Sequence, residues 1–446
     1  MFDVVIIGSG PAGLFTAYEL IANNFEGKIL IVDRGRDIEN RKCNSRCLNG
    51  SWCNPCNQVY GMGGAGGFSE GKLCVSGSTG LELEGNIQKL DKIANYVDEV
   101  ISQFLIKAGV YTKLRNVNRR KLIKAEKIFL VNKYPVRHLG SDNCFIFCKQ
   151  IKKYLTEKGV KFSFDTKVLD FEKDEMLFKI KTQSGKIIKS KFLVIAVGKS
   201  GWFWLKEVIM KHFGKNNFEV NPLYVGVRVE TLKSIAEPLY EISEDPKLKK
   251  IINGYNIKTH CFCHGGKVII CNYDGIKLVG GYANSNRDTI NSNFNVLCKL
   301  SFKEAEEKEQ FLKSTILNNS SKLPIVQRLE DLMKNRSTSF SKMEKNSIKP
   351  TLSIQPGNIL EFLPRAIIKS IIEFLRYLDK LASGLYSPDT LLYFPSVEWI
   401  YDKIRMDENL EFRKNLFIAG DCAGISQGIV SASITGVLIA REIIKR

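Results

Sequence analysis

Residues 2–13 read Phe-Asp-Val-Val-Ile-Ile-Gly-Ser-Gly-Pro-Ala-Gly, and this stretch decides the fold. Its six mostly apolar residues predict a buried strand, and Gly8-x-Gly10-x-x-Gly13 follows directly. A helical pattern occupies residues 14–21, and a second apolar stretch at 28–32 ends in Asp33. Strand, glycine turn, helix, strand and acid in this order predict a fold that binds an adenine dinucleotide.

The three glycines and the acid have separate roles in such a fingerprint. Gly8 permits the tight turn, Gly10 lets the backbone approach a pyrophosphate, and Gly13 lets the helix pack closely on the strand. The N-terminus of the helix offers unpaired N–H groups and a positive dipole end to the phosphates. The carboxylate of Asp33 stands where it can hold ribose hydroxyls.

Composition limits the class of protein. The chain has 446 residues, 44% hydrophobic and 25% charged, which is typical of a globular protein with two or three domains. No stretch is long and apolar enough to predict a membrane-spanning helix. Because the first strand follows Met1 directly, we expect no targeting peptide and a cytoplasmic location. Twelve cysteines in a reducing compartment then favour thiols, metal ligands or redox groups over structural disulfides.

The chain is strongly basic, with a net charge of +19. Such a charge attracts polyanions, and the densest basic run is Lys113–Lys127. Charge runs are more often solvated faces than binding patches. Nucleic acid therefore stays a less favoured partner.

Between the two ends of the chain, the pattern changes several times. Residues 36–80 are rich in Cys, Gly and Asn and predict a long functional loop. Apolar stripes predict helices at 93–108 and 141–155, and alternating stretches at 160–164, 176–182 and 187–197 predict a β-meander that ends at Gly198. Strands and helices mix from 214 to 385, which indicates a second, inserted domain.

The closing segment repeats the logic of the opening one. A short apolar stretch at 416–418 leads into Gly420-Asp421, and Gly428 precedes a helix that runs to Ile444. A carboxylate and a helix N-terminus can thereby be brought to the same cofactor from the other end of the chain.

Five stretches, taken with these motifs, resemble one family, the uncharacterised FAD-dependent dehydrogenases of the glutathione-reductase structural class. They are Cys53-Asn-Pro-Cys56, Gly63-Gly-Ala-Gly-Gly-Phe-Ser-Glu-Gly-Lys-Leu73, Arg137-His-Leu-Gly-Ser-Asp142, Cys261-Phe-Cys-His-Gly-Gly266 and Gly420-Asp-Cys-Ala-Gly-Ile-Ser-Gln-Gly428. The resemblance covers essentially the whole chain. It departs at Cys422, where the family has a small residue, and at His264, where the family has proline.

The resemblance implies an α/β fold with two parts. An FAD-binding, Rossmann-type domain of the glutathione-reductase kind, with a parallel sheet and a β-meander, would comprise residues 1–213 and 386–446. An inserted α+β substrate domain would comprise 214–385. The residues implied to contact FAD are Gly8, Gly10, Pro11, Ala12, Gly13, Asp33, Arg34, Gly64, Ala65, Gly66, Lys72, Val168, Gly198, Gly420, Asp421, Gly428 and Ile429.

The implied activity is that of an FAD-dependent oxidoreductase, a dehydrogenase or reductase that acts on an unidentified small or lipid-like substrate. Candidate catalytic residues are Lys72, His138 and Cys422, although His138 also fits a structural role and Cys422 also fits a bystander thiol. The chain has one dinucleotide fingerprint. NAD(P)H as donor would therefore bind over the flavin without a Rossmann unit of its own, or electrons would come from elsewhere, such as a protein donor.

The cysteines leave several readings open. Cys43, Cys47, Cys53 and Cys56 could hold zinc or an iron–sulfur cluster, form a redox dithiol, or be packed thiols. Cys261 and Cys263 share one face of a predicted strand, as active-site thiols or as core residues, and metal binding with the flanking histidines is a weaker option. The alternative functions are an electron-transfer or redox-sensing flavoprotein with a Cys-ligated cluster, and a flavoprotein that acts on RNA.

Overall fold

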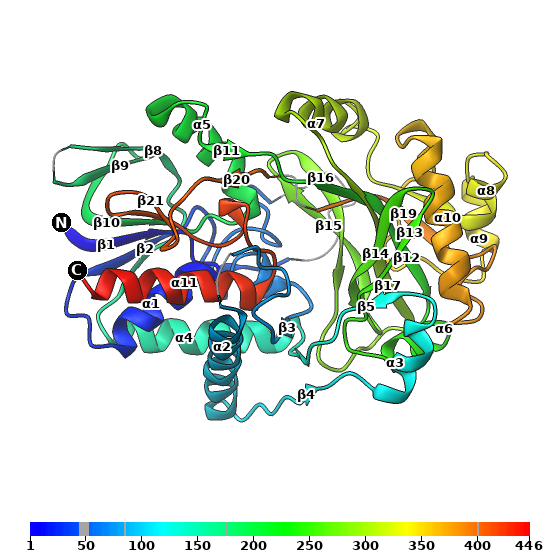
Figure 1. Cartoon of the computed structure of the whole chain (residues 1–446), viewed down its shortest axis with the longest axis horizontal. Helices are drawn as coiled ribbons and strands as arrows, with labels where there is room; N and C mark the ends of the chain where they lie inside the picture. The colour runs from blue at the N-terminus through cyan, green and yellow to red at the C-terminus, as the bar shows by residue number, and fades with distance from the viewer. Residues whose placement is uncertain (44–52, 84–85, 175, 399–400) are drawn as a thin grey trace.

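Two sheets, each with its own hydrophobic core, organise the chain and lie side by side in Figure 1. The structure is a computed structural model that describes residues 1–43, 53–83, 86–174, 176–398 and 401–446. The first body combines the two ends of the chain with part of its middle, and the second body is built mainly from residues between them.

The first sheet has the parallel core that the opening stretch predicts. In spatial order its parallel strands are β22 (Leu416–Ile418), β10 (Ile187–Ile195), β1 (Phe2–Ile7), β2 (Ile29–Val32) and β7 (Lys161–Ser163). An antiparallel strand, β21 (Glu411–Arg413), covers the β22 edge. Val4, Val5 and Ile6 are fully buried, as expected of a central parallel strand with both faces covered.

The β-meander is present, but one of its strands differs from the prediction. It consists of β8 (Val168–Lys173), β9 (Phe178–Thr182) and the beginning of β10. The stretch at 160–164, expected as its first strand, instead forms β7 and pairs in parallel with β2. Alternation of apolar residues predicts a strand, but it does not tell which neighbour that strand pairs with.

Helices flank the first sheet, and the two ends of the chain meet there. These helices are α1 (Pro11–Ala22), α2 (Ile87–Lys107), α4 (Ser141–Glu157), α5 (Trp202–Phe213) and α11 (Ile429–Ile444). The last helix, red in Figure 1, packs against α1 so closely that a Cβ at Gly436 would lie 2.2 Å from the Ala12 carbonyl oxygen. Both helices therefore start from the same end of the first sheet.

Short elements connect the first body to the second. A three-stranded sheet has the order β3 (Lys72–Cys74), β6 (Val136–His138) and β4 (Leu114–Arg115). The minor strands β11 (Phe218–Glu219) and β20 (Lys403–Ile404) pair with each other. Short 3-10 turns are η1 (Ile38–Asn40), η3 (Ala65–Phe68), η4 (Lys199–Gly201), η6 (Ile359–Glu361) and η7 (Gly420–Ala423), and η5 (Lys313–Leu317) is a π turn.

The second body is built on a seven-stranded antiparallel sheet. Its order is β18 (Ile325–Arg328), β19 (Leu391–Glu398), β12 (Leu223–Leu232), β17 (Asn291–Leu300), β14 (Tyr255–Cys263), β13 (Leu248–Ile252) and β5 (Leu130–Val131). Strands β5 and β19 thus come from outside residues 214–385. A separate hairpin, β15 (Lys267–Tyr273) and β16 (Ile276–Tyr282), extends from this body toward the first one.

The helices of the second body are mostly short. They are α3 (Arg119–Glu126), α6 (Lys233–Tyr240), α7 (Ala305–Leu312), α8 (Leu329–Met333), α9 (Phe340–Lys345) and α10 (Arg365–Asp379). The longest, α10, buries one apolar face against the sheet. Among the described residues, no helix combines the length and the apolar composition needed to cross a membrane.

Candidate functional site

The fingerprint glycines divide into those the fold requires and one it does not. Gly8 has φ +110°, and a Cβ there would lie 2.2 Å from the Ala196 carbonyl oxygen. A Cβ at Gly13 would lie 2.0 Å from the Gly8 carbonyl oxygen. Gly10 has an ordinary φ of −74°, and the nearest atom to its Cβ position is 3.7 Å away. The folded chain alone therefore does not explain glycine at position 10, whereas close approach of a ligand does.

A glycine loop, residues 61–68, lies against the fingerprint. The Gly63 N–H donates to the Ser9 carbonyl at 2.8 Å, and a Cβ at Gly64 would lie 3.0 Å from the Cα of Gly10. A Cβ at Gly66 would approach side-chain atoms of both Pro11 and Ile429, at 3.4 and 2.9 Å. The loop, with the predicted Gly64, Ala65 and Gly66, therefore lies between the beginnings of α1 and α11.

Both helices begin without a side-chain cap. The N-cap residues are Gly10 for α1 and Gly428 for α11, and neither can offer a side-chain acceptor. The first N–H groups of a helix have no partner within the helix and carry the positive end of its dipole. Two such ends beside one glycine loop form a site suited to a phosphate and a second electron-rich group.

Asp33 and Arg34, at the end of β2, are engaged within the protein. Asp33 accepts hydrogen bonds from the Ser9 N–H at 2.8 Å, the Ser9 hydroxyl at 2.7 Å and the Gly35 N–H at 2.7 Å. The guanidinium of Arg34 instead makes a bidentate ion pair with Asp274, at the tip of the β15–β16 hairpin, at 2.7 and 3.0 Å. Asp33 thus fixes the fingerprint turn, and Arg34 joins the two bodies.

A buried cation beside the glycine loop indicates an anionic ligand. Arg41 donates through Nε to the Asn57 carbonyl at 2.7 Å and through Nη1 to the Met62 carbonyl at 2.6 Å. Among the described residues its buried Nη2 has no hydrogen-bond partner. Burial lowers the pKa of Arg41 to about 10, so the side chain stays charged at neutral pH. An unpaired buried guanidinium nitrogen fits a site that receives negative charge.

Asp421 is the predicted carboxylate of the closing segment, and it lies half-buried on η7. It accepts a hydrogen bond from the Ser426 hydroxyl at 3.1 Å. Burial raises its pKa to about 6. The Gly420 N–H donates to Thr435 Oγ1 at 2.9 Å, which ties η7 to α11. Gly198 follows β10, the strand that pairs with β22. A Cβ added at Gly198 would meet no atom within 4 Å, so there is open space beside this residue.

Val168, one of the predicted FAD contacts, is buried at the start of β8. Its partner in the meander is Thr182. The meander joins the first sheet through β10, which pairs with β1 in parallel. The structure thus gives Val168 a place in a sheet, and its contact with a cofactor stays a prediction.

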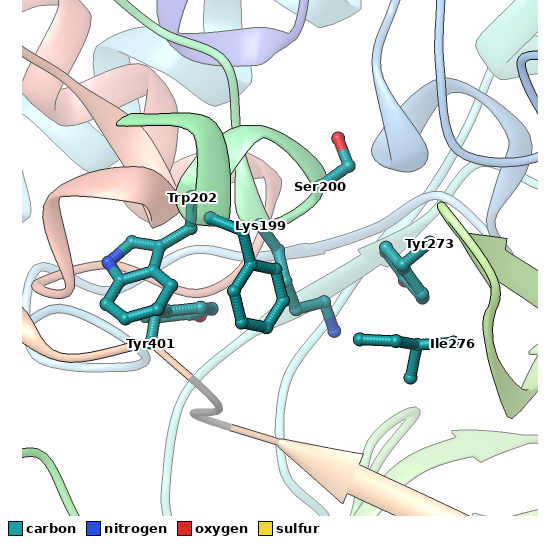
Figure 2. Close-up of a pocket in the computed structure, with 7 residues that line it drawn as sticks. Lys199, Ser200, Trp202, Tyr273, Ile276 and Tyr401 are labelled. Atoms are coloured by element: carbon teal, nitrogen blue, oxygen red, sulfur yellow. The ribbon is translucent and has the colours of Figure 1, made fainter. Parts of the chain in front are cut away.

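Next to Gly198, a small pocket lies between the two bodies. Figure 2 shows the Lys199 nitrogen directed into it, with aromatic rings on several sides. Its lining residues are Lys199, Ser200, Trp202, Phe203, Tyr273, Ile276 and Tyr401. The Lys199 ammonium lies 5.1 Å from the centroid of the Tyr273 ring. An apolar wall with a single cation suits a substrate that has both an apolar part and a negative or electron-rich group.

The predicted catalytic residue Lys72 belongs to a buried charge cluster. Its ammonium lies 2.8 Å from Asp245 and 3.2 Å from Glu70, and it donates to the Phe262 carbonyl at 2.8 Å. Burial opposes the charge on Lys72, but the two carboxylates outweigh this and raise its pKa. Burial also raises the pKa of Glu70 to about 7. Lys72 therefore stays charged and links the segment after the glycine loop to the second body.

His138, on β6, faces the same cluster. Its Nε2 atom is 3.6 Å from Glu70 Oε1 and has no hydrogen-bond partner among the described residues. Burial lowers its pKa to about 3, so the ring is neutral at physiological pH. A pKa this low makes the His138 ring a poor proton acceptor at neutral pH, which favours its structural role over a catalytic one.

Cys422 is fully enclosed and interacts only with backbone. Its Sγ lies 3.2 Å from the Ala419 carbonyl and 3.7 Å from the Ile195 carbonyl, positions that suit a thiol donor. Burial raises its pKa to about 12. Because this environment suppresses thiolate formation, it favours an unreactive, packed Cys422 thiol over a redox-active one.

The predicted metal cluster is only partly described. Cys47 lies outside the described residues, and Cys53 and Cys43 are partly exposed. Cys56 is buried and packs with Val59 and Tyr60 against the hairpin of the second body. Within the described ranges, the metal-compatible groups reduce to one set, Glu70, Cys261 and Cys263.

Sequence reasoning missed three residues that surround Glu70, Cys261 and Cys263. Arg228, Asp245 and Asn293 come from strands or turns of the second body and are buried around the two cysteines. The available signal was an arginine inside the apolar stretch 223–232, a position where a charge needs a specific partner.

The basic run Lys113–Lys127 is partly neutralised. Arg115 lies 3.5 Å from Glu244 and stacks over the Tyr240 ring, and Lys121 pairs with Glu241. These contacts favour a surface that packs against the second body over an open polyanion patch.

Comparisons with known proteins agree with a flavoprotein assignment for one region. Residues 222–397, which span β12 to β19, match the family described as FAD-dependent protein, C-terminal domain-like. A protein of Clostridium beijerinckii, described as uncharacterized, is 24% identical over 479 residues, which cover 99% of this chain and 80% of that protein.

Two solved structures are among those that the comparison matched to this chain. Glycine oxidase from Geobacillus kaustophilus has a TM-score of 0.46 and 11% identity, with 100% of this chain and 95% of that chain covered. Quinol fumarate reductase FrdA from E. coli has a TM-score of 0.45 and 14% identity, with 100% and 70% covered.

Proposed function

We propose that this protein is an FAD-dependent oxidoreductase. The observation that carries the proposal is the site at Gly10, where two uncapped helix N-termini and a glycine loop meet at a glycine that the fold itself does not require. The unpaired Arg41 nitrogen supports negative charge beside this loop, and the match of residues 222–397 supports FAD as the ligand.

The residues present fit this cofactor in an extended arrangement. The N-terminus of α1 would receive the pyrophosphate, and Asp33 would hold the adenosine ribose in place of one of its present donors. Asp421 would bind the ribityl chain. The glycine loop and the N-terminus of α11 would face the ring system, where a helix dipole favours a reduced, negatively charged ring. Bound FAD supplies two-electron chemistry with an organic substrate.

We further infer a glutathione-reductase-like FAD domain and an inserted substrate domain. The first sheet is assembled from both ends of the chain, which supports an insertion near residues 214–385. The pocket at Lys199 is lined from both bodies and favours a small or lipid-like substrate. With one dinucleotide fingerprint in the chain, NAD(P)H as donor would bind over the flavin, and a protein donor is the alternative source of electrons.

The absorption spectrum of the purified protein tests the proposal. We expect flavin bands, and acid release of one FAD per chain, either directly or after incubation of the protein with FAD. Anaerobic addition of NADH and then NADPH asks which nicotinamide bleaches the bands. A folded protein that retains and takes up no FAD would overturn the proposed function.

A further inference from the structure

Cys261 and Cys263 lie at an irregular place in β14. The pairing of β14 with β17 shifts register between His260 and Cys263, and Cys261 has a positive φ of +53°. In a regular strand, residues two apart are separated by about 6.6 Å, and a bulge bends the strand there. The two sulfurs and a carboxylate oxygen of Glu70 all lie within 4.8 Å of one another.

A buried guanidinium is directed at this pair. Arg228 donates through Nε to Asn293 at 2.7 Å and through Nη1 to Asn295 at 2.9 Å, which fixes its plane. Its Nη2 donates to the Cys261 carbonyl at 3.1 Å and lies 3.1 Å from Cys263 Sγ and 4.0 Å from Cys261 Sγ. Within the described parts of the chain, Arg228 forms no ion pair with a carboxylate. The acceptors around this buried guanidinium are neutral, and a thiolate at the cysteine pair would supply the negative charge that balances it.

Strand β16 leaves room for the contact between Arg228 and Cys263. A Cβ at Gly281, on β16, would lie 1.9 Å from Arg228 Nη2 and 2.3 Å from Cys263 Sγ. Only a residue without a side chain allows the guanidinium and the sulfur to meet there. The hairpin β15–β16 thus covers the pair on one side.

Glu70 is placed as the proton acceptor. Glu70 Oε2 lies 2.7 Å from Cys263 Sγ, where it can receive the thiol proton, and the ammonium of Lys72 lies 3.2 Å from the same oxygen. The neighbouring Cys263 thiol and the Arg228 guanidinium hold the pKa of Cys261 well below its usual range, whereas burial raises the pKa of Cys263. The pair therefore consists of one thiolate and one thiol, the form from which a disulfide is made.

A metal ion fits these residues less well. Three protein ligands would leave the fourth position of a tetrahedral site open, unlike the closed four-ligand sites that hold structural zinc. Two fixed cations, Arg228 and Lys72, already stand 3.1 and 3.2 Å from ligand atoms and would repel a third.

We propose that Cys261 and Cys263 form a redox-active dithiol that exchanges an electron pair with FAD, an inference that rests on the proposed function. Oxidation forms one Sγ–Sγ bond between Cys261 and Cys263 and breaks the S–H bond of Cys263. That proton passes to Glu70, and the electron pair passes to oxidised FAD together with one proton from solvent. In reverse, reduced FAD restores the thiolate and the thiol.

A single peptide reports the state of the pair. Cleavage after lysine releases residues 259–267, which contain both cysteines. The holoprotein is equilibrated with reduced and oxidised dithiothreitol at several ratios, quenched in acid and alkylated. We expect the peptide to change from doubly alkylated to an unalkylated form lighter by two hydrogens as the ratio becomes oxidising. A peptide that stays doubly alkylated at every ratio would overturn the dithiol.

Variants separate the pair from other thiols. In Arg228→Lys we expect the alkylation rate of Cys261 by iodoacetamide to fall about tenfold or more, because the conservative cation cannot reach both Sγ atoms in the same geometry. Cys298→Ala, in the core of the second body, is the matched control and should alter neither this rate nor the peptide. An unchanged rate in Arg228→Lys would overturn the assigned thiolate.

The last measurements test whether the cysteine pair exchanges electrons with FAD and whether it binds a metal ion instead. Dithiothreitol should bleach bound flavin, and Cys261→Ser should slow bleaching about tenfold or more; equal rates would overturn the exchange with FAD. One zinc ion per chain that is lost in Cys261→Ser would overturn the dithiol in favour of a metal site. A protein that binds no FAD would remove the proposed function, and the peptide assay would still decide whether the dithiol exists.

Discussion

Replacing Gly10 or Gly8 by alanine should have opposite consequences, although both belong to one fingerprint. At Gly8 the added Cβ would lie 2.2 Å from the Ala196 carbonyl oxygen, at a φ of +110°. Left-handed strain of roughly 1–2 kcal/mol and overpacking of about 1–3 kcal/mol predict that Gly8→Ala loses about 2–5 kcal/mol of folding free energy. At Gly10, with φ −74° and 3.7 Å of clearance, we expect a change within about 1 kcal/mol.

The order reverses for cofactor affinity. The Gly10 methyl would occupy the position that we assign to the pyrophosphate, so Gly10→Ala should weaken FAD binding at least about tenfold, or about 1.4 kcal/mol. Urea unfolding of the apoproteins measures the first quantity, and equilibrium dialysis with FAD measures the second. If Gly10→Ala folds normally and keeps the wild-type FAD affinity, the pyrophosphate does not lie against Gly10 and the placement of the cofactor is wrong.

Three further changes test other parts of the structure. Lys72→Met should lower the free energy of unfolding, measured with urea, by about 3–5 kcal/mol because it leaves buried Asp245 without its closest cation. Adding Asp245→Asn should recover part of this loss. A loss below about 1 kcal/mol in Lys72→Met alone would contradict the pairing. Burial raises the pKa of Asp421 from 3.8 to about 6, so its ionisation opposes folding. Asp421→Asn should therefore gain stability relative to wild type as pH rises through that interval, by up to about 3 kcal/mol in the apoprotein, and a difference independent of pH would refute the shift. Asp274→Asn breaks the partly exposed pair with Arg34 and should cost only about 0.2–1 kcal/mol, while hydrogen exchange in β15 and β16 should accelerate; unchanged exchange would show that the pair does not hold the hairpin.

The parts of the fold that sequence predicted are those with a local signal. The fingerprint at residues 2–13 predicted β1, α1 and the parallel sheet, because glycine spacing and apolar runs encode backbone geometry over a few residues. The stripes at 93–108 and 141–155 predicted α2 and α4 for the same reason.

Contacts between distant residues left no such trace. Lys72 meets Asp245, and Arg34 meets Asp274, across stretches of chain whose composition is unremarkable. The pairing of β7 with β2 depends on where α4 delivers the chain, not on the alternation within the strand. Cys261 and Cys263 were expected to share a face, but Arg228 beside them comes from another strand of the second sheet. The pKa values of Cys261 and Cys263 depend on these neighbours, so they could not be predicted from the sequence without the folded structure.

The close packing of α11 on α1 has a consequence for biosynthesis. The ribosome produces α1 early, yet the helix that covers it begins only at Ile429. At about 5–20 residues per second, roughly 20–80 s pass before Gly436 can settle on the Ala12 carbonyl. During this interval the nascent chain displays an apolar helix face without its partner, which makes it a client for chaperones that recognise such surfaces. Truncation before α11, or a stop codon there, would leave the polypeptide permanently in that exposed condition and direct it to proteolysis.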